Sequence, residues 1–281
     1  MFLITEKMAL TVQDIISCID ETAPFAIAES WDNVGLLVGD KNRLVSSVLV
    51  ALDPTSRLLD EAVAKGADMV ITHHPAIFKP LPNIDTADPE GQFLEKALVN
   101  RLSVLACHTN LDSAREGVND TLARLLGLEQ TTPLVPSGLP EEETGLGKIG
   151  YYPSRIDRAA FIEKLLQVLD LPSVQVAGVI PKVISCVAVC GGSGSGFAKT
   201  ARNRGADLYL SAEIKHDIAR WAEEAGFCVI DGTHYSTEKP AVTVLATRLR
   251  DYARKKGWKI TIEETTTERH PFVSVDAQKY L

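Results

Sequence analysis

Two segments of the chain follow one pattern: an apolar run, a helix-like stretch, the tripeptide Gly-Ala-Asp and a second apolar run. The two copies comprise residues 48–52, Gly66-Ala67-Asp68 and 69–72, and then residues 187–190, Gly205-Ala206-Asp207 and 208–211. Short apolar runs separated by helices are typical of α/β proteins with parallel strands, and a glycine commonly ends a helix. We therefore predict two similar α/β halves. A chance likeness between two strand–helix–strand units is the alternative.

The junction between the halves is predicted in residues 133–147, which hold three prolines, three glycines and an acidic run. Such composition is typical of loops. We predict a first domain over residues 1–135 and a second over 146–281, each with a mainly parallel sheet flanked by helices. We expect helices over residues 12–22, 119–126 and 240–255, and further strands of the second half over 148–152, 174–179 and 259–265.

Length and charge limit the classes of protein to consider. A chain of 281 residues is long enough for two ordinary domains. Its formal net charge of −8 disfavours nonspecific nucleic-acid binding as the main role. No apolar stretch reaches membrane-spanning length, and residues 1–7 are too short and too soon polar for a signal peptide. We expect a cytoplasmic protein without a membrane partner.

Three of the apolar runs end in histidines, two of them with a carboxylate four residues later. The residues are His73 and His74 after the first run, His108 with Asp112 after the second, and His234 with Glu238 after the third. Open α/β sheets place their ligand sites at the carboxyl ends of strands, so these side chains are expected to converge between the two halves. Six such groups are too many for one tetrahedral zinc but suit two metal ions.

The ligand types narrow the metal and the chemistry. Imidazole and carboxylate ligands suit zinc, iron or manganese. The chain has no CxxC pair, which disfavours a metal site made of thiolates. A lone histidine is more often structural, and Asp112 alone would equally be a helix cap. Two divalent ions would carry more positive charge than two carboxylates offset. The remaining positive charge would attract anionic oxygens of a substrate. It therefore favours metal-assisted hydrolysis as the reaction type.

A glycine-rich loop and two polar side chains could complete the site. Gly191, Gly192, Ser193 and Gly194 could bind a phosphate through backbone amides, or could form only a flexible turn. Their spacing matches neither a Walker loop nor a dinucleotide fingerprint. Glu213 and His216 follow the next strand, where they could carry protons or orient other groups. An ordinary surface histidine is an equal reading for His216.

In combination, these motifs resemble the GTP cyclohydrolase I type 2-like family, also called the NGG-interacting-factor-three-like family. The similar segments are Trp31-Asp32-Asn33-Val34-Gly35-Leu36, His73-His74-Pro75 with Phe78, His108-Thr109-Asn110-Leu111-Asp112, Gly191-Gly192-Ser193-Gly194, and His234 with Glu238. The resemblance implies that His73, His74, His108, Asp112, His234 and Glu238 bind two metal ions. It also implies two similar α/β domains and a ring-shaped homohexamer. Many members carry two histidines where this chain has His216 and Asp217.

The resemblance implies a reaction as well. The leading hypothesis is a metal-dependent hydrolase, in which a metal-activated water attacks a nucleotide or related anionic substrate; opening of the GTP ring is one such reaction. Glu213 and His216 are the candidate proton carriers. The alternative is a non-catalytic metal-binding adaptor that acts through a ring-shaped oligomer. The sequence identifies neither the metal nor the substrate.

Overall fold

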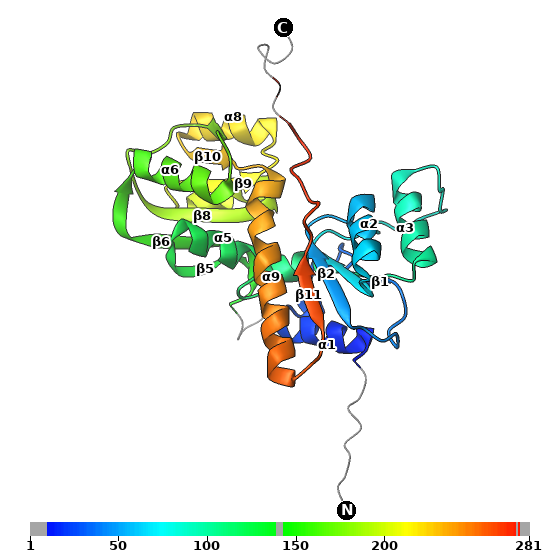
Figure 1. The fold of residues 1–281 in the computed structure, drawn as a ribbon. Helices are drawn as coiled ribbons and strands as arrows, with labels where there is room; N and C mark the ends of the chain where they lie inside the picture. The colour runs from blue at the N-terminus through cyan, green and yellow to red at the C-terminus, as the bar shows by residue number, and fades with distance from the viewer. Residues whose placement is uncertain (1–9, 139–142, 274, 276–281) are drawn as a thin grey trace, which may run out of the picture.

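Two β-sheets, each covered by helices on both faces, form two lobes on either side of the long helix α9 (Figure 1). The computed structural model describes residues 10–138, 143–273 and 275. Residues 1–7, which the signal-peptide prediction concerns, lie outside the described residues. Residues 139–142, in the middle of the predicted junction, also lie outside them. The mixed α/β class that the sequence predicts is confirmed.

The first lobe contains a five-stranded sheet in the order β1-β4-β3-β2-β11. Its strands are β1 (Gly35–Val38), β2 (Ser47–Ala51), β3 (Met69–Thr72), β4 (Ser103–Ala106) and β11 (Thr261–Glu264). Its helices are α1 (Val12–Thr22), η1 (Phe25–Ile27), α2 (Ser56–Lys65), α3 (Pro89–Val99) and α4 (Thr109–Ser113). Helices α2 and α3 cover one face, whereas α1 and α9 (His234–Lys256) cover the other. All pairings except β1 with β4 are parallel.

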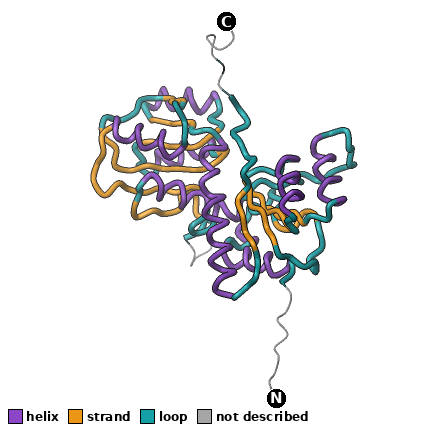
Figure 2. The backbone as a smooth tube through the Cα atoms, viewed as in Figure 1, coloured by secondary structure: helices purple, strands orange, loops and turns teal. Residues whose placement is uncertain are grey.

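The second lobe contains a six-stranded sheet in the order β5-β6-β8-β9-β10-β7. Its strands are β5 (Glu129–Pro136), β6 (Gly145–Asp157), β7 (Gln175–Ala177), β8 (Val183–Ser193), β9 (Leu208–Ala212) and β10 (Cys228–Asp231). Its helices are α5 (Val118–Leu126), α6 (Arg158–Leu169), η2 (Ser195–Phe197), α7 (Ala198–Asn203) and α8 (His216–Ala225). Helices α5 and α6 cover one face, and α7 and α8 cover the other, so each sheet lies between helical layers (Figure 2).

The sheets differ from the prediction in three respects. Residues 259–265 were expected to add a strand to the second half, but β11 pairs with β2 of the first sheet. The reason is that α9 packs along α1 in the core of the first lobe, so the chain leaves α9 beside β2. The predicted first domain likewise includes β5, which pairs with β6 in the second sheet. The expectation of mainly parallel strands is wrong for the second sheet, where β5–β6, β6–β8 and β10–β7 are antiparallel.

The Gly-Ala-Asp tripeptide is built alike in both lobes. Gly66 ends α2 with a left-handed φ of +64°, after which the Asp68 carboxylate accepts hydrogen bonds from the amides of Ser46 and Ser47 at 2.7 and 3.1 Å. The Asp207 carboxylate accepts in the same way from the amides of residues 185 and 186, at 2.7 and 2.8 Å. In each lobe the aspartate that follows the helix therefore hydrogen-bonds to the chain at the start of a neighbouring strand, β2 in the first lobe and β8 in the second.

Helix α9 begins at His234, earlier than the predicted start at Pro240. The Thr233 hydroxyl accepts a hydrogen bond from the Ser236 amide and caps the helix, so Pro240 lies inside it. This early start places the first turn of α9 beside the carboxyl ends of β8 and β9, since Thr237 contacts Gly192 and Glu213 contacts His234. In the described part of the chain, no helix is both long and apolar enough to cross a membrane.

Candidate metal centre

All six predicted ligands converge where the two lobes meet. Their donor atoms fall into three groups, within each of which all atoms lie within 4.8 Å of one another. The groups are His73, His74 and His108; His74, His234 and Glu238; and His73, Asp112 and Glu238. Because His73, His74 and Glu238 each belong to two groups, the three groups form one continuous cluster. The cluster gathers residues 165 positions apart in sequence, from 73 to 238.

Adjacent histidines reach the same cluster because β3 ends at Thr72. The amides of His73 and His74 still donate to the carbonyls of residues 51 and 52, at 3.2 and 2.9 Å. The Thr72 hydroxyl then donates to the carbonyl of His74 at 2.7 Å, where the chain turns before Pro75. The two imidazole rings consequently lie only 4.9 Å apart, centre to centre. On a continuing strand they would point to opposite faces of the sheet.

The two histidine–carboxylate pairs use a helix for the same purpose. His108 is the residue directly before α4, without a capping side-chain bond, and Asp112 lies within α4, whereas His234 and Glu238 both lie in the first turns of α9. Residues four apart project from one helical face. Both carboxylates are buried, with Asp112 8% and Glu238 2% exposed. Asp112 is therefore not a solvated acid, and it lies within α4 rather than at its N-cap position, which His108 occupies.

Each histidine is fixed through its Nδ1 atom, and each Nε2 atom faces the cluster. The Nδ1 partners are the Cys107 carbonyl for His73 (2.8 Å), Asp53 for His74 (2.7 Å), Asp32 for His108 (2.8 Å) and Glu213 for His234 (2.9 Å). Hydrogen bonds of this kind fix the tautomer and ring orientation of metal-binding histidines. Asp32 and Asp53 were not among the predicted site residues. The position of Asp53 directly after a strand was the available signal.

The centre of the cluster contains buried polar atoms without hydrogen-bond partners among the described residues. They are Nε2 of His73, Oδ1 of Asp112 and Oε2 of Glu238. The Glu238 oxygen lies 3.0 Å from Nε2 of both His74 and His234, but these contacts lack hydrogen-bond geometry. An unsatisfied buried polar atom costs about 1–3 kcal/mol. Divalent metal ions would satisfy all three atoms, so the residues present fit a metal centre.

The pKa values of the cluster show how strongly it attracts positive charge. Burial by itself would lower the pKa of His74, but Asp53 and Glu238 raise it to about 10. Burial likewise opposes protonation of His234, yet Glu238 raises its pKa to about 9. Burial raises the pKa of Asp112, whereas His73 and its neighbours hold the pKa of Glu238 well below its ordinary value despite burial. Metal ions would replace these protons.

The two predicted proton carriers lie in different surroundings. Glu213 has a left-handed φ of +50° and its carboxylate accepts from Nδ1 of His234, so it holds a cluster histidine. Burial would raise the pKa of Glu213, but the bond to His234 lowers it overall. His216 is exposed at the start of α8. Within the described ranges it makes no hydrogen bond or ion pair with the cluster.

The amides of the three glycines in the loop are engaged within the protein. Gly191 donates to Asn119, Gly192 to Thr237 and Gly194 to Ser211. The glycines instead give Glu238 room, because a Cβ on Gly192 would lie 2.1 Å from Glu238 Oε1. Of the two alternatives for Gly191, Gly192, Ser193 and Gly194, these bonds favour a turn that packs against the protein over a phosphate-binding nest.

The cluster opens toward solvent beside His234, the most exposed of its histidine side chains at 32%. A cavity of about 950 Å³ lies next to it and is lined in part by Glu213, His234, Tyr235 and Lys239. Beside His108, Trp31 and Phe78 lie edge to face 6.0 Å apart, and each ring lies just over 6 Å from the His108 imidazole. Both aromatic rings are substantially exposed, at 58% and 42%.

Curated relatives share most of the chain. A "GTP cyclohydrolase 1 type 2 homolog" of Clostridium acetobutylicum is 32% identical over 250 residues, which cover 89% of this chain and 93% of that protein. A protein with the same name from Streptococcus pneumoniae is 32% identical over 270 residues, covering 94% and 99%.

Solved structures show the same fold. The Staphylococcus aureus hypothetical protein SA1388 matches with a TM-score of 0.87 and 30% identity, over 95% of this chain and 100% of that one. Reduced HcgD from Methanocaldococcus jannaschii matches with a TM-score of 0.77 and 29% identity, over 92% and 98%. The model of the Duf34/NIF3 (NGG1p interacting factor 3) family matches residues 10–271. The chain therefore belongs to the Duf34/NIF3 family.

Proposed function

We propose that the protein is a metal-dependent hydrolase that acts on a nucleotide or a related anionic small molecule. The six clustered residues would hold two divalent ions (iron, zinc or manganese) between the lobes. The observation that carries the proposal is the set of buried, unpartnered atoms of His73, Asp112 and Glu238 at the centre of the cluster. When bound, the metal ions would polarise the substrate and activate a water molecule.

The chain's own groups would orient and balance the site. Asp32, Asp53 and Glu213 hold three imidazoles with Nε2 inward. Asp112 and Glu238 supply the negative charge that favours cations. We assign Glu213 to positioning His234, since its carboxylate is already engaged there. His216 stays a candidate proton carrier. Its side chain is exposed to solvent and lies outside the cluster.

The surroundings support a nucleotide-sized substrate. The cavity beside His234 falls within the ~300–1,000 Å³ of most small-molecule sites. The exposed rings of Trp31 and Phe78 offer flat surfaces on which a purine could stack. The relatives' printed name makes GTP the first substrate to assay. A ring-shaped homohexamer belongs to the same proposal, and light scattering of the purified protein would test it.

The test compares metal content and turnover in matched variants. Protein purified without chelator should hold about two metal ions per chain. We expect the His108→Ala variant to lose metal, because His108 belongs to the cluster. The His216→Ala variant should keep its metal, because His216 lies outside the cluster. Loaded protein would then be assayed with GTP and a panel of nucleotides and phosphoesters.

Each outcome separates the alternatives. Turnover that follows metal content through the variants supports the hydrolase. Full metal content without turnover of any compound overturns it, and would favour a non-catalytic adaptor. If neither purified nor anaerobically iron-loaded protein bound metal, the dinuclear centre itself would be refuted.

A further inference from the structure

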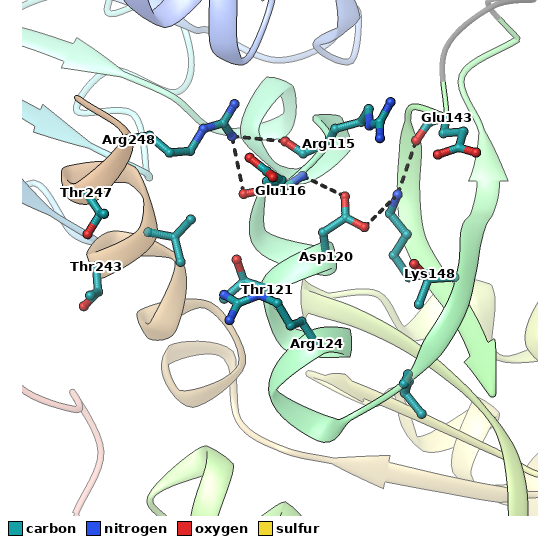
Figure 3. A pocket seen from close by; sticks show the side chains of 13 residues that line it. Arg115, Glu116, Asp120, Thr121, Arg124, Glu143, Lys148, Thr243, Thr247 and Arg248 are labelled. Carbon is teal, nitrogen blue, oxygen red and sulfur yellow. Dashed lines mark hydrogen bonds and ion pairs between the residues drawn. The ribbon is translucent and has the colours of Figure 1, made fainter. Parts of the chain in front are cut away.

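A second hollow, of about 520 Å³, lies away from the metal centre between α5, α9 and β6 (Figure 3). None of the six clustered residues lines it. Its walls come from the loop before α5, from α5 itself, from the middle of α9 and from β6. Nothing in the proposed hydrolase uses this hollow, so its chemistry has to be explained separately.

Three arginines line the hollow without a carboxylate partner among the described residues: Arg115, Arg124 and Arg248. The Arg248 guanidinium donates only to carbonyl oxygens, including that of Thr22 at 2.9 Å. Figure 3 shows its bonds to the carbonyls of Arg115 at 3.0 Å and Glu116 at 3.4 Å. Arg115 and Arg124 are exposed. A guanidinium is always charged, and a partly buried one is normally paired. The wall therefore carries positive charge that the protein does not neutralise by contact.

The acidic groups of the hollow leave this charge in excess. Lys148 is buried and pairs with Asp120 at 3.1 Å, and Asp120 also accepts from the amide of Glu116 at 2.9 Å. The carboxylates of Glu116 and Glu143 remain, and neither makes an ion pair within the described ranges. Two carboxylates thus face three unpaired guanidinium groups.

A buried hydroxyl gives an independent indication of a ligand. Thr121 lines the hollow on α5, is only 2% exposed, and its Oγ1 atom has no hydrogen-bond partner in the described part of the chain. Such atoms are costly unless water or a ligand satisfies them. It lies one turn before Arg124 on the same helix, so one bound group could contact both.

We propose that this hollow binds a phosphate-bearing small molecule of about nucleotide size. Arg115, Arg124 and Arg248 bind its phosphate oxygens, for which the planar guanidinium offers paired donors. The Thr121 hydroxyl donates to the same ligand. The volume lies within the range of small-molecule sites. The site is distinct from the metal centre and does not depend on the proposed hydrolase.

Titration calorimetry on the metal-loaded, full-length protein tests the proposal, with inorganic pyrophosphate and ADP as probes. The metal centre could bind the same probes, so the Asp112→Asn variant serves to weaken that centre. We expect a binding event that survives Asp112→Asn and weakens at least tenfold in the double variant Arg115→Gln/Arg124→Gln. Both arginines are exposed, so the double variant should fold. Arg155→Gln is the matched control, since Arg155 is exposed on β6 outside the hollow.

A second variant tests the site without changing its net charge. Thr121→Val removes the buried hydroxyl with little change of shape, and should weaken the surviving event several-fold while the melting temperature is kept. Binding that is unchanged in the double variant would overturn the proposal. So would the absence of any event that survives Asp112→Asn, or an equal loss in Arg155→Gln, which would indicate nonspecific charge attraction. None of these results bears on metal content or turnover.

Discussion

The Gly192→Ala substitution should disable the metal centre by displacing one ligand. Gly192 has a φ of +64°, and an added Cβ would lie 2.1 Å from Oε1 of Glu238 and 3.2 Å from Nε2 of His234. A carbon–oxygen approach below 3.0 Å is essentially never seen. The carboxylate must therefore move by about 1 Å, whereas metal–ligand distances tolerate only about 0.2 Å.

The expected magnitude has two parts. The left-handed backbone costs alanine about 1 kcal/mol of stability. Displacement of Glu238 removes a carboxylate that belongs to two of the three ligand groups. Replacing a group that only hydrogen-bonds a metal-binding side chain typically reduces metal affinity by about 10–100-fold. We therefore expect a loss of at least about 100-fold, with metal content falling to half or less.

Substitutions at two other glycines separate the effect of backbone strain from the effect of displacing Glu238. Gly205→Ala carries the backbone strain alone, since its φ is +84° and nothing lies within 4 Å of the added Cβ. Gly196→Ala, in the same loop as Gly192, meets nothing within 4 Å and has no left-handed φ. Elemental analysis and a competitive chelator titration would give the affinity, and thermal unfolding the stability. A Gly192→Ala variant that binds metal as tightly as Gly196→Ala would refute the geometry of the centre.

Three further outcomes follow from the described contacts. Asp32→Asn should weaken metal binding by about 10–100-fold, measured by chelator competition, because the carboxylate orients His108 at 2.8 Å. Burial would raise the pKa of Glu61, but hydroxyls and Lys65 lower it from 4.5 to about 2. The ionised Glu61 carboxylate therefore stabilises the fold above pH 4.5, and this stabilisation is lost as pH falls toward 2. In urea titrations, Glu61→Gln should lower the free energy of unfolding by about 2–3 kcal/mol at pH 7 and by little at pH 2. An equal loss at both pH values would contradict this. Phe161→Ala should cost about 3–5 kcal/mol by the same method, because the ring is fully buried in the second lobe.

The ligands were predictable because local chain signals carry the information. An apolar run that ends in a histidine predicts a strand end, and parallel strands gather their carboxyl ends at one edge. His73 and His108 meet for this reason, at the adjacent ends of β3 and β4. The pairs His108–Asp112 and His234–Glu238 converge because four residues make about one helical turn.

Other features depended on contacts that no local pattern encodes. Asp32 lies 76 positions from His108, and its role depends on where the loop before β1 lies. The sequence left the loop glycines as either a phosphate-binding nest or a flexible turn, but the need for glycine at position 192 depends on Glu238, some 46 positions later. The three arginines of the second hollow come from two helix regions that only packing brings together.

The sequence by itself determined the α/β alternation, the glycine that follows the helix in each Gly-Ala-Asp segment and the ligand types of the centre. These follow from hydrophobic period, helix ends and donor chemistry, which act within a few residues. Only the tertiary structure decided that β11 joins the first sheet, that β5 joins the second, and which atoms face one another across the lobes. Those choices depend on burying α9 against α1 and β2, a long-range packing free energy that no short segment contains.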